Sequence, residues 1–213
     1  MSGYKDESGE INLEAGGFVK GVALALVTQN QDPDGLGRVK LRYPWHHQSN
    51  ESDWVRIAVS MAGPGRGMLF LPEVGDEVLV AFEREDLRYP YVIGCLWNGK
   101  EEPPESNANG RNDLRMIKTR KGHTLVFDDA DAKGRIELRL NDGKRLRIDD
   151  DGIALDDGAG NRIEIDSKGG NMTLQAAGKL TLKAPVIALE SSGTLSLKAS
   201  ATASLQGQLV TIN

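Results

Sequence analysis

Few residues of this chain have the types and spacing that catalysis or ligand binding requires. Gly63-Pro-Gly-Arg-Gly67 contains the glycines of a phosphate-binding loop but lacks the Gly-Lys-Ser/Thr ending and the following helix. The segment from Asp129 to Gly134 begins like a calcium loop, yet Lys133 replaces a ligand and Leu140 occupies the position of the closing Glu. We therefore predict a barrel loop at the first segment and a hairpin turn at the second.

The remaining candidate groups are scattered. His46, His47 and His123 do not form a tetrahedral ligand set with the single cysteine on this spacing. Cys95 stands in an apolar run, which predicts a buried, reduced thiol. Asp149-Asp-Asp151 is most simply a solvated turn. We expect no metal and no cofactor.

Catalytic arrangements are equally hard to find. A glycosidase needs paired carboxylates in a cleft, and a lysozyme-like domain would not fit into a linker of about 15 residues. The Ser, Thr and Cys residues have no identifiable base beside them. The sequence therefore predicts a protein that is not an enzyme.

Composition narrows the classes of partner. The 213 residues carry a net charge of −5, and basic residues are spread among acidic ones, whereas nucleic-acid binding needs clustered Lys and Arg. The polar N-terminus lacks the layout of a signal peptide, and no apolar stretch approaches the ~20 residues of a membrane helix. We expect synthesis in the cytoplasm without a signal peptide, and no nucleic acid as partner.

The elements that position these residues are all β-strands. Five β-rich runs, at 18–28, 38–44, 54–60, 77–83 and 91–97, are separated by Gly, Pro, Asn and Asp clusters. Five short strands in about 80 residues fit a small closed barrel of the OB type. We divide the chain into an N-terminal arm at 1–16, an OB-fold domain at 17–99, a linker at 100–113 and β-strand repeats at 114–213.

The repeats consist of short x-Leu-x-Leu units that return about every eight residues near the C-terminus. At about 3.3 Å per residue, one repeat spans roughly 26 Å, which is enough for one strand along one side of a rod. Turn signals at 141–143, 151–152 and 157–161 predict strands that pair back and forth between about 122 and 166. Beyond Gly170 the breaks are small residues suited to gentle corners, which favours several chains wound together over a meander of hairpins.

Strict alternation of apolar and charged residues gives the predicted repeat strands one apolar face and one charged face. A lone ribbon has no second layer, so copies must share a core, and three walls leave fewer open edges than two. The fold class is therefore all-β: an OB-fold barrel followed by an intertwined trimeric β-helix, or β-prism. The predicted trimer-core residues are Leu174, Leu180, Leu182, Ile187, Leu189, Leu195, Leu197 and Leu205.

Several segments of the first domain resemble one known family. They are Asp32–Trp45, Trp54–Ala58, Ala62–Gly67, Leu71–Phe82 and Gly94–Gly99. The residue sequences of these segments and their order along the chain closely resemble the OB domain of VgrG and phage baseplate-V spike proteins. Gly122–Asp129 resembles the start of that family's β-helix.

The resemblance implies a homotrimeric central spike of a contractile injection system, assembled into a phage tail or phage-tail-like particle. It implies that the prism pierces the target membrane and carries a PAAR-type tip protein. Only about 16 residues precede the barrel, so we expect a separate hub protein at the OB end and a phage-like particle. The chain ends without the His-x-His iron site of some phage spikes; open strand ends there would bind the tip protein through Leu209, Val210, Thr211, Ile212 and Asn213.

Two other functions remain open at this point. An OB barrel can bind single-stranded nucleic acid, with Tyr43, Trp45, Trp54 and Phe82 as stacking platforms. Trimeric prisms also build receptor-binding or sugar-binding fibres.

Overall fold

The structure is a computed structural model that describes residues 18–46, 51–131 and 134–212. The chain divides into two compact units, Met1–Ala108 and Asn109–Asn213, and both are built from strands. Among the described residues the single helical element is the short 3-10 turn η1, Glu83–Glu85. None of the described helices has the length or the apolar character to cross a membrane. The N-terminal arm at 1–16 lies outside the described residues.

The first unit is a five-stranded barrel, as predicted. Its sheet has the order β2-β1-β6-β7-β3. The strands are β1 (Val22–Gln29), β2 (Lys40–Arg42), β3 (Arg56–Ile57), β6 (Glu77–Phe82) and β7 (Pro90–Leu96). The antiparallel bridge between Val39 and Val55 joins the two edges, with backbone hydrogen bonds of 3.0 and 2.7 Å. Closure leaves no free edge in the barrel.

Alternation along the strands places the barrel core. In β6, Val78, Val80 and Phe82 are buried while the residues between them are partly exposed. β1 contributes Ala25 and Val27 in the same way. This is the period-two pattern of a strand with one face against a core. The complete buried cluster is Val19, Ala25, Val27, Val39, Leu41, Tyr43, Val55, Val78, Val80, Phe82 and Val92.

Two local features of the barrel bear on the sequence predictions. The Gly63–Gly67 segment is a small hairpin, in which β4 (Ala62–Gly63) pairs with β5 (Arg66–Gly67), so it is a barrel loop. The prediction that Cys95 is buried is wrong, because its side chain is exposed. A register shift between β6 and β7 skips Ile93, and from that point β7 leaves the core, whose last β7 member is Val92.

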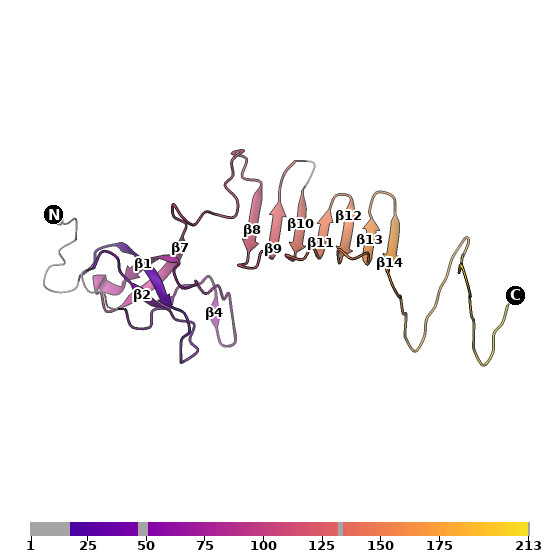
Figure 1. Cartoon of the computed structure of the whole chain (residues 1–213), viewed down its shortest axis with the longest axis horizontal. Helices are drawn as coiled ribbons and strands as arrows, with labels where there is room; N and C mark the ends of the chain where they lie inside the picture. The colour runs from indigo at the N-terminus through magenta and orange to yellow at the C-terminus, as the bar shows by residue number, and fades with distance from the viewer. Residues whose placement is uncertain (1–17, 47–50, 132–133, 213) are drawn as a thin grey trace. The chain divides into compact units, whose positions relative to one another are not determined.

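The second unit contains a single-layer antiparallel sheet in which strands follow one another in chain order (Figure 1). We call this sheet the ribbon. Its strands are β8 (Leu114–Lys118), β9 (Thr124–Asp128), β10 (Arg135–Arg139), β11 (Arg145–Asp149), β12 (Gly152–Asp156), β13 (Arg162–Asp166) and β14 (Asn171–Gln175). The back-and-forth pairing predicted between about 122 and 166 is confirmed.

Beyond Gln175 the chain continues as an extended, exposed trace to residue 212, which we call the distal segment (Figure 1). It has no assigned strand within its described residues. The ribbon and the distal segment together bury almost none of their apolar side chains: of the described residues beyond Ala108, only Val126 belongs to the buried hydrophobic set. This half of the chain therefore has no core of its own.

Candidate functional site

The ribbon presents two chemically distinct faces. Each strand has five residues, and the register pairs apolar positions with apolar positions on one face across the five successive hairpins from β9 to β14. In the first hairpin Ile117 lies opposite Leu125, but Arg115 lies opposite Phe127. For example, Leu146 lies opposite Leu155, and Ile153 lies opposite Ile165. The result is two parallel rows of apolar side chains on one face. The members are Ile117, Leu125, Phe127, Ile136, Leu138, Leu146, Ile148, Ile153, Leu155, Ile163, Ile165, Met172 and Leu174.

This apolar face is open. Leu155 is 50% exposed and Ile163 is 37% exposed, which is comparable with the 39% and 41% exposure of the charged Arg162 and Glu164 side chains on either side of Ile163. These apolar side chains are therefore about as open to solvent as the charged ones, because no second layer of the chain covers them. A groove of about 430 Å³ lies over the part of this face between β10 and β14, and its lining includes Leu138, Leu146 and Leu174. Exposed apolar surfaces of this kind mark sites of protein association.

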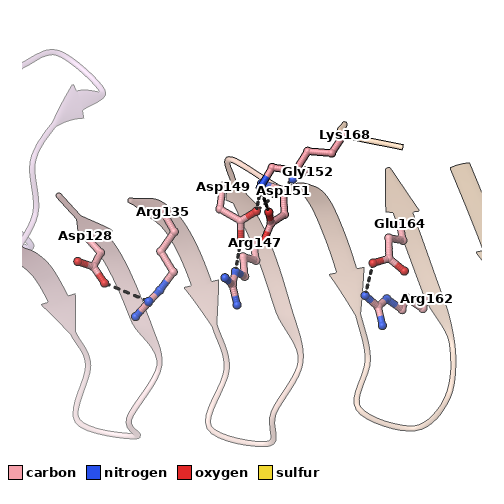
Figure 2. A network of polar contacts seen from close by, with 9 residues as sticks. All are labelled: Asp128, Arg135, Arg147, Asp149, Asp151, Gly152, Arg162, Glu164 and Lys168. Carbon is pink, nitrogen blue, oxygen red and sulfur yellow. Dashed lines mark hydrogen bonds and ion pairs between the residues drawn. The ribbon is translucent and has the colours of Figure 1, made fainter. Parts of the chain in front are cut away.

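The opposite face carries a line of ion pairs (Figure 2). Asp128 of β9 and Arg135 of β10 pair at 3.0 Å, and Arg145 of β11 pairs with Asp156 of β12 at 3.3 Å. Arg162 and Glu164 pair within β13 at 2.5 Å. Opposite charges in cross-strand positions stabilise a sheet modestly, by about 0.2–1 kcal/mol each. This face suits contact with water.

Aspartates cap the ribbon turns. The Asp149 carboxylate accepts hydrogen bonds from the amides of Asp151 and Gly152 at 2.9 and 3.1 Å, and Arg147 pairs with it from the same strand. Partial burial acts against the charge, but these donors outweigh it and lower the pKa of Asp149. Asp151 in turn pairs with Lys168 of the next turn on this edge (Figure 2). The acidic cluster at 149–151 is therefore a turn, as predicted, but two of its carboxylates are paired rather than simply solvated.

The predicted trimer-core residues lie in β14 and the distal segment, and all are exposed in the single chain. Leu174 continues one of the apolar rows, and Leu197 is 77% exposed. The predicted tip-binding residues Leu209, Val210, Thr211 and Ile212 are exposed too, with Ile212 at 87%. Asn213 lies outside the described residues.

Sequence reasoning missed the N-terminal end of the apolar face. Leu125 and Phe127 of β9 lie opposite Leu138 and Ile136, so they extend both rows. Ile117 of β8 lies opposite Leu125. The signal was the alternation within Thr124–Asp128, which places these two residues on one side of a strand.

The aromatic residues proposed as base-stacking platforms are arranged for packing. Tyr43 and Phe82 belong to the buried core, with ring centroids 5.9 Å apart. Burial raises the pKa of Tyr43 to about 12. Trp45 packs on both rings and donates its indole N–H to the Leu24 carbonyl at 2.8 Å. Two of the four platforms are therefore closed to a nucleic acid.

A buried carboxylate organises the loop between β1 and β2. Asp32 accepts hydrogen bonds from the amides of Asp34 and Leu36 and from the Arg38 guanidinium, whose Nε and Nη2 each lie 2.8 Å from a carboxylate oxygen. The Asp32 side chain is 3% exposed. Arg38 and the backbone donors hold the pKa of Asp32 well below its usual range. The cluster is internally saturated, which indicates a structural clamp rather than a ligand site.

Among the residues that the structure describes, no group of three or more His, Cys, Asp or Glu side chains is placed to hold a metal ion. His123 accepts a hydrogen bond from the Asn141 amide through Nδ1. The segment 129–134 joins two antiparallel strands, as the predicted hairpin turn requires, but Lys133 lies outside the described residues.

Comparison with known families gives two matches, one in each unit. Residues 23–97 match the injector OB domain of type VI secretion systems and phage baseplates. Residues 115–172 match the phage baseplate V C-terminal trimerisation domain, and they span the ribbon from β8 into β14. The chain belongs to the VgrG and phage baseplate-V spike family.

Individual relatives in this family are much longer. The chain is 34% identical to the type VI secretion system spike protein VgrG1b of Pseudomonas aeruginosa over 125 residues, which cover 54% of this chain and 17% of that protein. It is 34% identical to VgrG1a of the same organism over 117 residues, which cover 51% of this chain and 18% of that protein. It is 27% identical to the actin cross-linking toxin VgrG1 of Vibrio cholerae over 173 residues, covering 76% and 16%. The chain thus corresponds to less than a fifth of each of these spike proteins.

Proposed function

We propose that three copies of this chain form the central spike of a contractile injection system. The barrels form a collar seated on a separate hub protein, and the ribbons and distal segments form a stiff β-prism that pierces the target membrane. The part played by this chain is mechanical and not enzymatic.

One observation carries the proposal: the apolar face of the ribbon is exposed at nearly all of its side chains and coincides with the family's trimerisation domain. Full burial of a Leu or Ile side chain contributes roughly 1.5–3 kcal/mol, so burying the exposed half of each contributes on the order of 1 kcal/mol. Summed over both rows in three chains, this exceeds the ~4–15 kcal/mol that each of the two association steps costs.

The same arrangement suits a rod that carries load. In the ribbon, backbone hydrogen bonds join every strand to the next, so a force along the stack passes through each ladder in turn and is shared among the hydrogen bonds of that ladder. Three ribbons that share one apolar axis cannot slide past one another without exposing that axis to water. Assembly therefore converts a single-layer sheet into a stiff prism.

The C-terminal end suits a tip protein. Leu209, Val210 and Ile212 are exposed in an extended segment, and open strand ends can be extended by strands of another protein. We propose a PAAR-type tip there, held by Leu209–Asn213.

Replacing Ile212 by Asp is expected to abolish co-purification with such a tip protein while leaving the trimer intact.

Native mass spectrometry and solution scattering of the purified chain test the trimer directly. We expect the mass of three chains and an elongated scattering profile at micromolar concentration. Leu197→Asp places three like charges around the axis, so it is expected to abolish the trimer or cause aggregation. Ser196→Asp alters the neighbouring residue on the opposite side of the strand and serves as the control. A compact monomeric wild-type protein contradicts the proposal.

The rival nucleic-acid function has little support in the geometry. Tyr43 and Phe82 are in the barrel core, and the net charge of −5 disfavours a polyanion. No feature of the described residues favours a sugar-binding site over an assembly face.

A further inference from the structure

The distal segment leaves its backbone unpaired within its own chain. Between 176 and 212, the described amide hydrogen bonds are those of Ala177 to the Asn161 side chain and of Gly193 to the Ser191 hydroxyl, at 3.0 and 3.3 Å. The ladder of the ribbon stops at β14, an edge strand that is exposed at every residue. Unpaired backbone groups in a packed rod are costly, so the partners of this segment must come from other copies of the chain.

Threefold winding determines which residues of those copies become neighbours. If one repeat crosses one wall and the next repeat crosses the next wall, a rotation of 120° puts the second repeat of a neighbouring chain directly above the first repeat. Every strand on a wall is then followed by the next repeat of another chain. Because all three chains wind in the same sense, these strands run parallel and equivalent positions stack side by side.

The equivalent outward positions carry charges of alternating sign. Lys183, Glu190 and Lys198 each stand three residues after the first member of an apolar pair, Leu180, Ile187 and Leu195 respectively. In a strand, this offset places each charge on the side opposite its apolar pair. All three charged side chains are exposed, and none forms an ion pair with another described residue of its own chain.

We propose that Lys183, Glu190 and Lys198 form a ladder of ion pairs between chains on the outer surface of the prism. Each Glu190 lies between Lys183 of one neighbouring chain and Lys198 of the other, on strands about 4.8 Å apart. This inference rests on the proposed trimer and adds the residues that align its chains.

The ladder distinguishes the correct register from a shifted one. A slip of one chain by one repeat places Lys183 beside Lys198 on one wall and Glu190 beside Glu190 on another, so that like charges meet. The apolar pairs alone permit that slip, because each repeat presents nearly the same two aliphatic side chains. The alternating charges thus specify a register that the core does not.

Charge reversal in the full chain tests the ladder. The variants are Glu190→Lys, which makes the whole ladder positive, and the triple exchange Lys183→Glu, Glu190→Lys, Lys198→Glu, which restores alternation with inverted signs. Lys121→Glu, in the turn between β8 and β9, is the matched control. Trimer dissociation is followed by light scattering during heating, at low salt and at high salt.

We expect Glu190→Lys to lower the dissociation temperature by several degrees at low salt, with a smaller shift at high salt because salt screens exposed charges. The triple exchange should return the value to that of the wild type, and Lys121→Glu should leave it unchanged. If the wild type is trimeric but none of the three variants changes the dissociation temperature, the ladder is overturned while the spike proposal remains intact. A wild type that is not trimeric overturns both.

Discussion

Gly152 stands at a position of the ribbon that has no space for a side chain. It is buried at the start of β12, opposite Asp166, and a Cβ there would overlap with the carbonyl oxygen of Ile165. Gly152→Ala must therefore push two paired strands apart. We expect it to destabilise the ribbon by about 1–3 kcal/mol, as overpacking does. Thermal unfolding followed by circular dichroism measures this loss of stability.

Gly99→Ala is the control for this substitution, because a Cβ at Gly99 meets no heavy atom within 4 Å. Equal melting temperatures for the Gly152 and Gly99 variants would show that β12 and β13 are less tightly paired than described.

The aspartates of the turns make stability depend on pH. The pKa of Asp157 is lowered because the Asn161 side chain and the amides of Ala159 and Asn161 donate hydrogen bonds to its carboxylate. The pKa of Asp166 is lowered by the Gly169 amide and the Asn171 side chain. Folding thus favours the ionised form of both groups. Their contribution is fully present above the usual value of 3.8 and is lost as the pH falls through the lower folded values.

We therefore predict that stability stays level from pH 7 to about 5 and falls below about 4. Asp157→Asn retains an acceptor in the turn but removes one titrating group, so the variant should lose less stability on acidification than the wild type. Urea titrations at several pH values measure this difference. Identical acid-induced losses in the two proteins would count against a role of this carboxylate.

At the scale of elements, β14 connects the self-paired ribbon to the distal segment. Leu174 lies in an apolar row opposite Ile163, and Gln175 lies opposite Arg162 on the charged face. Leu174→Asp would bury a carboxylate in the shared axis, at a cost of about 3 kcal/mol or more per chain. We expect this variant to dissociate into monomers or aggregate, as measured by native mass spectrometry.

Gln175→Asp is the matched control, since it adds the same charge one residue later on the face that carries Arg162. We expect it to remain trimeric. Dissociation of both variants to the same extent would mean that the two faces of β14 are not distinguished by assembly.

At the scale of the whole molecule, the ribbon and the distal segment contribute to stability in different ways. The ribbon makes its own backbone ladder, so three copies need only join their apolar faces. In the proposed prism the distal segment pairs only between chains, so wound chains must separate before any one of them is free, which slows dissociation. A chain ending at Gln175 should therefore still form trimers but dissociate faster than the full chain in hot detergent.

Time courses of the trimer band on gels measure this difference, with both proteins at the same concentration. A shortened chain that persists as long as the full one would show that the distal segment adds no kinetic stability.

Local patterns in the sequence determined much of this architecture. β-Rich runs such as 77–83, bounded by Gly, Pro, Asn and Asp clusters, predicted the barrel strands, and Asp-Gly and Asn-Asp-Gly signals predicted the ribbon hairpins. Both depend on residues that are neighbours in the chain, so they can be recognised without a structure. The exposed aliphatic stripe likewise follows from alternation alone.

Only the tertiary structure decided what depends on pairing between distant strands. The register shift beside Leu79 exposes Cys95, and barrel closure buries Tyr43 and Phe82, which sequence reasoning had considered for base stacking. The pairing of β9 with β10 brings Phe127 into the apolar row. Bulges, register and closure are set by many contacts at once, and no short stretch of residues encodes them.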